Sequence, residues 1–577
     1  MTQERRKGIR VRIIAVEAVF FLFVFLLGVK AVKIQVLESD VLRKKAEKEY
    51  TGYREIQGKR GEILDRNMNR LGTTIDAFSV AVSPVKNHNA AKDSRALALI
   101  LNIDKKKLER KLNSKKNFAW IKKRISPSQA DRIRELKIQG LFFKNDVIRF
   151  YPNRNLAAQV IGFTGTDGNG LEGLEYQYND LLKGSDVKVN ITKDANGKYF
   201  DNEQRLEKRY SGGSILLTID SAIQYISESA LKDAVLKFRA ASGMAIVMKP
   251  ETGEILAMAH YPEFNPNSFS DFSRKRWRNR AVTDPFEPGS TMKVFVAASA
   301  MDQGYCTPKT IFFCENGAYR IGRFTIHDTH KHGWLTLNQI IKFSSNIGAV
   351  KISETTGKKV LFNSLSLFGF GKKSDIGCPG ESAGTLSSYT RWADIDAGAI
   401  AFGQGMSVSA LQLITGVSAI ANNGVRMKPL LVKEIYAGHG DVIKRFSPVA
   451  VTRVVSEESS KKVRRMMRFV VEAEGTGTNA AIPGYSVCGK TGTAQKVAED
   501  GKGYSKKDYT ALFVGFAPER KPDLAVLVVI DEPRGNHYGG IVAAPAFKRI
   551  LAESLHHLNI SPDIAQERLV AEISNGG

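Results

Sequence analysis

The feature that most constrains the fold of this chain is a set of three short motifs that lie far apart in the sequence. They are Ser290-Thr291-Met292-Lys293, Ser344-Ser345-Asn346 and Lys490-Thr491-Gly492. Their hydroxyl, amine and amide groups can act together only if the fold brings all three motifs to one cleft. We therefore expect them in a single domain.

Ser290 and Lys293 are predicted to be a nucleophile and its base. The sequence FEPG at 286–289 breaks the preceding chain, and residues 290–300 are typical of a buried, apolar helix that Ser290 opens. Side chains at i and i+3 share a helix face, so the Lys293 amine is expected to reach the Ser290 hydroxyl. A lysine becomes such a base when burial or a neighbouring positive charge lowers its pKa, and Lys490 is the expected second cation.

The third motif is predicted on a strand, because strand-like runs precede and follow it. Gly489 and Gly492 are expected to leave its edge uncluttered, so that a peptide substrate can pair along it. The hydroxyl groups of Thr491 and Thr493 would then lie near the terminal carboxylate of that peptide.

Two further groups of atoms complete the expected site. The backbone N–H groups of Ser290 and Thr493 are predicted to form an oxyanion hole, where loss of one donor costs about 2.7–4 kcal/mol of barrier. Ser344 and Asn346 are expected on a turn before an apolar helix, where they would relay protons and orient Lys293. The ordered conjunction of the motifs indicates acyl transfer through a serine.

Further motifs carry a resemblance to a known family. Residues 60–67 (RGEILDRN), 252–258 (TGEILAM) and 279–284 (NRAVTD) resemble motifs of class B penicillin-binding proteins, and the resemblance covers nearly the whole chain. Residues 401–405 (AFGQG) and 538–545 (YGGIVAAP) are most similar to the division-specific, FtsI-type branch. The elongation-specific relatives share every catalytic motif, so roles at the septum and at the side wall both stay open.

The resemblance implies an α+β fold, with an antiparallel sheet that has helices on both faces. This penicillin-binding fold would follow a single transmembrane helix and an elongated pedestal, and a chain of 577 residues is too long for one core. The expected division is a cytoplasmic tail (1–12), a transmembrane anchor (13–33), a pedestal of the dimerisation type (34–210), a transpeptidase domain (211–560) and a C-terminal tail (561–577).

The N-terminal segment is predicted to be an uncleaved membrane anchor. Residues 13–29 are apolar apart from Glu17, which is the lower length limit for a spanning helix. A cleaved signal peptide is the alternative, but its apolar region is shorter and residues 28–31 offer no small-x-small cleavage site. Lysine and arginine flank both ends, so charge does not decide orientation. A cytoplasmic N-terminus and a periplasmic bulk at the inner membrane are what the resemblance implies.

The resemblance also implies the reaction. Ser290 would attack the D-Ala–D-Ala terminus of one peptidoglycan stem peptide, release D-alanine and pass the acyl group to an amine on a second stem. No cofactor and no metal are expected, and β-lactams would acylate Ser290. The expected partners are the lipid II-derived glycan with its stem peptides, an FtsW-type glycan polymerase and other divisome membrane proteins.

Three alternatives use the same motifs differently. A carboxypeptidase or β-lactamase would need a group that activates water, and no E-x-x-x-N element lies between the second and third motifs. A drug sensor of this fold would carry several spans and a zinc protease, but the chain contains no H-E pair. A pseudoenzyme that serves as a division scaffold is the third alternative.

Several local patterns favour structural interpretations. The GNGLEG sequence at 168–173 lacks the strand and later acidic residue of a dinucleotide site. His327, Asp328, His330 and His332 have a spacing that could suit a metal, but a polar loop beside the cleft is the simpler interpretation.

Charge and cysteine content add little to the functional prediction. A net charge of +26 could indicate nucleic acid, but a solvated surface facing anionic lipid and wall polymer explains it more simply. The lysine-rich residues 104–123 are predicted to be helical. Cys306 and Cys314 are close enough in sequence for a small loop disulfide in an oxidising compartment, whereas Cys378 and Cys488 are expected to be buried thiols.

Overall fold

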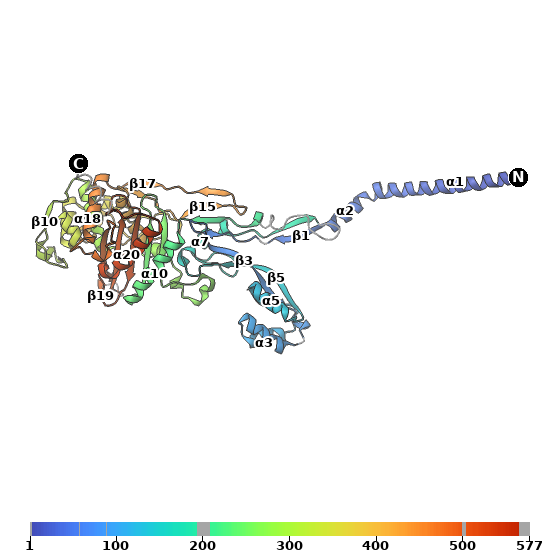
Figure 1. Cartoon of the computed structure of the whole chain (residues 1–577), viewed down its shortest axis with the longest axis horizontal. Helices are drawn as coiled ribbons and strands as arrows, with labels where there is room; N and C mark the ends of the chain where they lie inside the picture. The colour runs from blue at the N-terminus through green and yellow to red at the C-terminus, as the bar shows by residue number, and fades with distance from the viewer. Residues whose placement is uncertain (1–2, 57, 88, 193–207, 499–502, 565–577) are drawn as a thin grey trace. The chain divides into compact units, whose positions relative to one another are not determined.

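The computed structural model describes residues 3–56, 58–87, 89–192, 208–498 and 503–564, so most of the predicted C-terminal tail lies outside the described residues (Figure 1). Contacts divide the chain into two compact units, Met1–Lys59 with Gly184–Ser211, and Arg60–Lys183 with Gly212–Gly577. The boundary between pedestal and transpeptidase domain at residue 210 stays a prediction. By their contacts, residues 60–183 belong to the larger unit.

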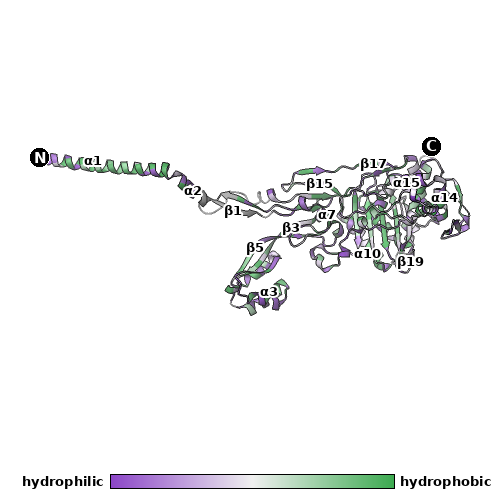
Figure 2. Cartoon of the chain, turned by 180° about the vertical axis from the view of Figure 1, so that it is seen from behind, coloured by the Kyte–Doolittle hydropathy of each residue, from purple (hydrophilic) through white to green (hydrophobic). Residues whose placement is uncertain are grey.

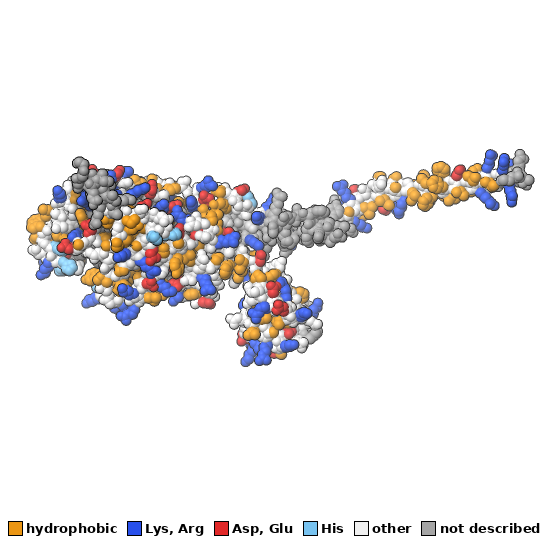
Figure 3. All heavy atoms as spheres, viewed as in Figure 1, with side chains coloured by type: hydrophobic (Ala, Val, Ile, Leu, Met, Phe, Trp, Pro, Cys, Tyr) orange, Lys and Arg blue, Asp and Glu red, His pale blue; other side chains and the backbone are white. Residues whose placement is uncertain are grey.

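The first unit begins with a long apolar helix. α1 (Gln3–Val32) has 30 residues, a length of about 45 Å, and a π-helical turn (Lys33–Leu37) continues it. This exceeds the ~30 Å hydrocarbon core of a bilayer, and Arg5–Leu37 is the one segment among the described residues with the length and composition to cross a membrane. Figure 3 shows hydrophobic side chains along α1 and cationic side chains at its N-terminal end.

The helix is longer than the predicted span of 13–33, because helical backbone includes the cationic tail. The remaining described elements of the first unit are α2 (Ser39–Tyr50) and the antiparallel strands β1 (Thr51–Ile56) and β6 (Val187–Thr192).

A five-stranded antiparallel sheet organises the larger unit. Its order is β18-β19-β20-β8-β9, and the bounds are Cys488–Val497, Tyr504–Ala517, Leu524–Asp531, Ser242–Met248 and Ile255–Tyr261. Several strands of this sheet are strongly hydrophobic, as the green ribbons in Figure 2 show. Along β20, Val526 and Val528 belong to one hydrophobic core and Leu527 and Val529 to the other, because alternate side chains point to opposite faces.

Helices cover both faces of this sheet, which confirms the predicted fold class. One core contains residues of α10 (Ser221–Lys237) and α20 (Ala544–His557). The other contains residues of α12 (Met292–Asp302), α17 (Ala410–Ala421) and α18 (Glu457–Val471).

A second sheet joins residues 60–82 to the rest of the larger unit. Its path is β16-β15-β7-β2-β3-β4, with β5 also paired to β3, and the bounds are Val442–Arg445, Val432–Tyr436, Ser214–Leu217, Ile63–Leu64, Arg70–Val82, Ala119–Ile125 and Leu141–Phe150. Arg60 donates to the buried Glu175 at 2.6 Å. A Cβ on Gly61 would lie 1.8 Å from the Gly213 carbonyl oxygen, so only glycine fits there.

The lysine-rich residues 104–123 are only partly helical, which corrects the prediction. α4 (Lys105–Leu112) is helical, but β4 begins at Ala119 and pairs with β3. Trp120 and Ile121 favour a strand, and pairing with β3 decides the outcome. α3 (Ala90–Leu101), α4 and α5 (Pro127–Glu135) pack with these strands around a small core of their own.

Candidate active site

Ser290 lies at the start of a buried helix, one turn from Lys293. The structure places it in a short 3-10 turn, Gly289–Thr291, and α12 follows from Met292, so Ser290 precedes the α-helix rather than opening it. Met292–Met301 are buried, as the apolar sequence predicts. Gly289 has φ of +54°, a conformation that glycine adopts without strain.

The Lys293 amine joins the first two motifs. Its Nζ lies 3.0 Å from Ser290 Oγ, 2.5 Å from the Ser344 carbonyl oxygen and 2.7 Å from Asn346 Oδ1. Lys293 is 1% exposed, and this burial lowers its pKa to about 7, against the opposing effect of Asp328. A neutral amine has two N–H bonds, which match the two shortest contacts, and a lone pair that can accept the Ser290 proton.

Ser344 and Asn346 lie on the predicted turn between two helices. Ser344 ends α13 (Leu337–Phe343) with φ of +62°, and Ser345 caps α14 (Asn346–Thr356) by accepting from the Gly348 N–H. The left-handed residue reverses the chain so that the carbonyl and hydroxyl of Ser344 both contact Lys293.

Lys490 completes the arrangement from β18. Its Nζ donates to Ser344 Oγ at 2.8 Å and to the Thr491 carbonyl at 3.1 Å. Lys490 is 0% exposed; burial first, and then the charge of Lys293, hold its pKa well below the ordinary lysine value. Ser344 Oγ thus bridges both amines, which gives a continuous path for a proton.

β18 is an edge strand, as the sequence predicts, and it passes beside the Ser290 turn. A Cβ on Gly289 would lie 2.9 Å from the Thr493 carbonyl oxygen, so the backbones at both residues are adjacent. The two N–H groups predicted for the oxyanion hole therefore belong to neighbouring segments. A Cβ on Gly492 would lie 2.7 Å from Leu512 Cγ, which gives this glycine a packing role as well.

The two threonines of β18 have different environments. Thr491 is 8% exposed, and its hydroxyl lies 3.1 Å from Thr476 Oγ1. Thr493 is less buried and accepts from the Gly539 N–H at 3.2 Å. Of the two predicted carboxylate-binding hydroxyls, Thr493 is the more accessible.

Asp328 is a residue of the site that sequence reasoning missed. Its carboxylate accepts from Ser345 Oγ and from the backbone N–H groups of Asn346 and Ile347. It therefore holds the turn that carries Ser344 and Asn346, and it sits at the N-terminus of α14 where a negative charge is favourable. Asp328 lies 17 residues before Ser345, so no local sequence pattern links the two.

Asp328→Ala is expected to destabilise the fold by about 2–4 kcal/mol and to slow acylation of Ser290 about 10–100-fold, because buried donors of the turn lose their acceptor. Thermal unfolding and the acylation rate of the full-length protein would measure both effects. Glu354→Gln, which alters an exposed acceptor of Tyr319, is the control. Wild-type rates in Asp328→Ala would exclude a positioning role.

The structure also bears on the metal site and the disulfide that the sequence left open. Within the described residues, no cluster of histidine, cysteine, aspartate or glutamate side chains could hold a metal. His327 contributes its carbonyl to Asn346 Nδ2 at 2.9 Å, and the ring of His332 stacks on Phe343. Cys306 and Cys314 are both unpaired, so the disulfide alternative is wrong in this structure.

Comparison with known proteins decides the family. The penicillin binding protein transpeptidase domain matches residues 243–552, and the penicillin-binding protein dimerisation domain matches residues 55–217. This chain is a class B penicillin-binding protein.

Relatives of this penicillin-binding protein cover most of its length. Stage V sporulation protein D of Bacillus subtilis is 37% identical over 88% of this chain and 79% of the relative. The peptidoglycan D,D-transpeptidase FtsI of Escherichia coli is 33% identical over 93% of this chain and 90% of the relative. Penicillin binding protein 3 of Mycobacterium tuberculosis, solved with aztreonam, has a TM-score of 0.69 and 28% identity, with 88% of this chain and 98% of that chain covered.

Membership of this family shows which class of substrate and which class of inhibitor the protein binds. This penicillin-binding protein acts on peptidoglycan and binds β-lactams. The one long apolar helix of the part of the chain that the structure describes fits a membrane anchor.

Proposed function

We propose that this penicillin-binding protein is a D,D-transpeptidase that cross-links peptidoglycan stem peptides at the division septum, with Ser290 as its nucleophile. The observation that carries this proposal is the buried Lys293 amine, which lies 3.0 Å from Ser290 Oγ and has a pKa lowered to about 7. Such an amine is substantially neutral at physiological pH and can accept the serine proton.

The reaction proceeds through an ester. Neutral Lys293 takes the proton as Ser290 Oγ attacks the carbonyl of the penultimate D-alanine, and the N–H groups of Ser290 and Thr493 hold the oxyanion. The C–N bond then breaks, and the terminal D-alanine leaves with a proton. An amine of a second stem attacks the ester, forms the cross-link and returns Ser290 to its hydroxyl form.

The other residues of the site act on this proton and on the substrate. Ser344 relays the proton between the lysines, and Asn346 orients Lys293. Lys490 holds the Ser344 hydroxyl by donating to it at 2.8 Å. Thr491 and Gly492 shape the strand, and the Thr493 hydroxyl meets the substrate carboxylate.

The proposal also assigns roles along the chain. Residues 13–33 anchor the protein in the inner membrane, 34–210 form a pedestal for partners and 211–560 carry the chemistry, between tails at 1–12 and 561–577. The partners are an FtsW-type glycan polymerase and other divisome membrane proteins, and the bulk of the chain is periplasmic.

Ser290→Ala tests the nucleophile. Full-length protein in detergent is incubated with a penicillin and followed by intact mass, and we expect one stable adduct in the wild type and none in Ser290→Ala. Ser299→Ala, which removes another hydroxyl of α12, is the control and should still be labelled. Rapid loss of the adduct would indicate a hydrolase, and labelling of Ser290→Ala would exclude Ser290.

Depletion of the protein from cells distinguishes a role in division from roles in side-wall synthesis and in sporulation. Filaments that stop dividing are expected for a septal role, and Ser290→Ala should not restore division. Loss of rod shape would point to side-wall synthesis, and a defect confined to spores would place the protein with the sporulation relative from B. subtilis.

A further inference from the structure

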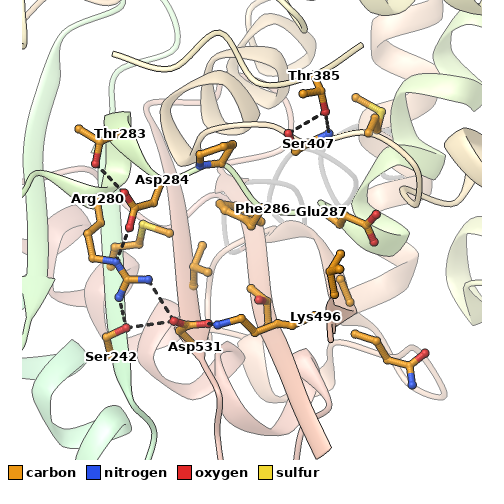
Figure 4. A pocket seen from close by; sticks show the side chains of 18 of the residues that line it. Ser242, Arg280, Thr283, Asp284, Phe286, Glu287, Thr385, Ser407, Lys496 and Asp531 are labelled. Carbon is orange, nitrogen blue, oxygen red and sulfur yellow. Dashed lines mark hydrogen bonds and ion pairs between the residues drawn. The ribbon is translucent and has the colours of Figure 1, made fainter. Parts of the chain in front are cut away.

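The surfaces described so far suit the peptide part of peptidoglycan. β18 offers an edge for strand pairing, and a cavity of about 640 Å³ lies beside residues 494–497 of this strand. Figure 4 shows that charged side chains of this cavity, among them Lys496 and Asp531, pair with each other. Peptidoglycan is a glycan to which the reacting peptides are attached. A surface for sugar rings is therefore expected within one peptide length of the catalytic residues.

A small two-stranded sheet lies in the segment that leads to the second catalytic motif. It pairs β10 (Ile311–Phe313) with β13 (Trp334–Thr336) in antiparallel register. The middle residues of the two strands, Phe312 and Leu335, pack into the core that also contains α12. Because alternate side chains of a strand point to opposite faces, the flanking residues of both strands share the outer face.

The outer face of this sheet is aromatic and exposed. Phe313 lies directly opposite Trp334, with ring centroids 4.9 Å apart, and Ile311 lies on the same face. Trp334 is 69% exposed and Ile311 is 57% exposed. The other three tryptophans of the chain are partly or fully buried. Ile311, Phe313 and Trp334 thus form an aromatic platform on the surface.

Hydrogen bonds hold the platform at both ends of the sheet. The Cys314 N–H donates to the Gly333 carbonyl at 2.7 Å, and the Leu337 N–H donates to the Thr310 carbonyl at 2.9 Å. The backbone that carries the aromatic side chains is therefore fixed before any ligand arrives. A surface that is ordered in advance loses little conformational entropy on binding.

α13 connects the platform to the reaction site. This helix begins after Thr336 and ends at Ser344, and its seven residues span about 10 Å. About three residues of an extended peptide cover the same distance. A sugar ring on the platform is therefore at the right distance to carry a peptide that reaches the catalytic residues.

The size of the platform favours a sugar over a protein. Each strand has three residues and the strands lie about 5 Å apart, so the face covers on the order of 100 Å². A specific protein interface buries about 800 Å² on each partner, which is far more. One or two sugar rings match the platform. The apolar C–H face of such a ring packs on an aromatic side chain, which removes apolar surface of both from water.

An amide lies at the edge of the platform. A Cβ on Gly333 would lie 3.6 Å from Asn316 Oδ1, so the Asn316 side chain adjoins the residue before Trp334. Asn316 is exposed, and its side chain has no hydrogen-bond partner among the described residues. An amide offers both donors and an acceptor, which match the acetamido group of an N-acetylated amino sugar.

We propose that the aromatic platform binds an N-acetylated amino sugar ring of the peptidoglycan glycan, with Trp334 against the ring and Asn316 at its acetamido group. The inference rests on the proposed transpeptidase function and adds a glycan-binding site to it. The glycan is then held about 10 Å from Ser344, while a peptide attached to it enters the reaction site.

A tetramer of β-1,4-linked N-acetylglucosamine tests the proposal. It is titrated into the full-length protein in a detergent without sugar headgroups, and saturation-transfer NMR shows which sugar protons contact the protein. We expect binding with a Kd on the order of 1 mM, mainly through ring C–H protons. Trp334→Ala should weaken this binding about tenfold, because it removes the most exposed ring of the platform. Trp334→Phe, which keeps an aromatic face, should retain most of it.

Two controls accompany the titration. Tyr225→Ala removes an aromatic side chain that is 67% exposed on α10, and it should bind the tetramer as the wild type does. Cellotetraose has the same chain without acetamido groups, and it should bind the wild type about fivefold more weakly, which corresponds to one hydrogen bond. Penicillin acylation of each variant checks the fold, and Trp334→Thr, which favours a strand, replaces Trp334→Ala if the latter fails this check.

The outcomes separate this inference from the proposed function. No binding to the wild type, or equal binding to the wild type and Trp334→Ala, would overturn the inference while leaving Ser290 acylation intact. Equal binding of the two sugars would overturn the assignment of the acetamido group. Absence of sugar binding, together with failure of Trp334→Ala to restore division in depleted cells, would overturn the inference in favour of a partner protein. Failure of penicillin to acylate Ser290 in the wild type would instead overturn the proposed function.

Discussion

Lys293→Gln is expected to slow acylation of Ser290 by penicillin by about 10³-fold, because a positioned general base contributes about 10²–10⁴-fold to such a step. Glutamine fills similar space and can donate to the Ser344 carbonyl and Asn346, but it cannot accept the serine proton. The fold should therefore survive while the proton transfer is lost. Stopped-flow or intact-mass kinetics with a penicillin in excess would give the rate.

Lys232→Gln is the matched control for this prediction. Lys232 lies on α10 and pairs with Glu263, on the face of the sheet that does not carry the site. It should acylate at the wild-type rate. A Lys293→Gln rate within tenfold of the wild type would show that another group takes the proton.

Lys293 also sets the pH dependence of the acylation rate. Burial lowers the pKa of Lys293 to about 7, so below that pH the amine is protonated and cannot act as a base. The wild-type acylation rate should rise with pH to a plateau, with an apparent pKa about 7 for the coupled lysine pair. Lys293→Gln should lose this titration, and a profile that falls through neutral pH would contradict the assignment.

Gly403→Ala is the second substitution with a large expected effect. Gly403 has φ of +84°, and a Cβ there would lie 2.1 Å from the carbonyl oxygen of Gly289, in the turn that carries Ser290. The Gly289 N–H also donates to the Gly403 carbonyl at 3.1 Å. We expect this clash to displace the turn that carries Ser290, and a shift of ~1 Å at such a site costs about 10²-fold in rate.

Gly304→Ala separates this clash from the backbone strain of alanine. Gly304 also has a positive φ, +76°, but nothing lies within 4 Å of an added Cβ. It should cost about 1–2 kcal/mol of stability and leave the acylation rate near the wild-type value. Equal rates for Gly403→Ala and Gly304→Ala would show that the turn before Ser290 tolerates the displacement.

Sequence reasoning could place the nucleophile and its base because helix geometry is local. Residues three apart share a face, so the Ser290–Lys293 contact follows from four letters. The strand at Lys490 and the turn at Ser344 followed from apolar runs and helix signals. No sequence pattern predicts that these two motifs contact the first one. That prediction rested on resemblance to a family in which the three motifs form one site.

What sequence reasoning missed depends on contacts between distant segments. Asp328 appeared as part of a histidine-rich loop, although its carboxylate caps the helix that begins at Asn346. Residues 119–123 appeared as the continuation of a lysine-rich helix, but they pair with β3. Glu287 appeared only as part of a helix-breaking motif. Its burial beside Gly405 and Tyr504 depends on segments that are more than 100 residues away in the sequence.

The four cysteines have a practical consequence. All are unpaired and at least 92% buried, and burial raises their pKa values, so neither a cross-link nor a reactive thiol is present in the native protein. A cysteine introduced at Leu99, which is 82% exposed on α3, would therefore be the single site for maleimide chemistry. A fluorophore placed there would report on the part of the chain around α3, α4 and α5, and none of the native cysteines would have to be replaced first.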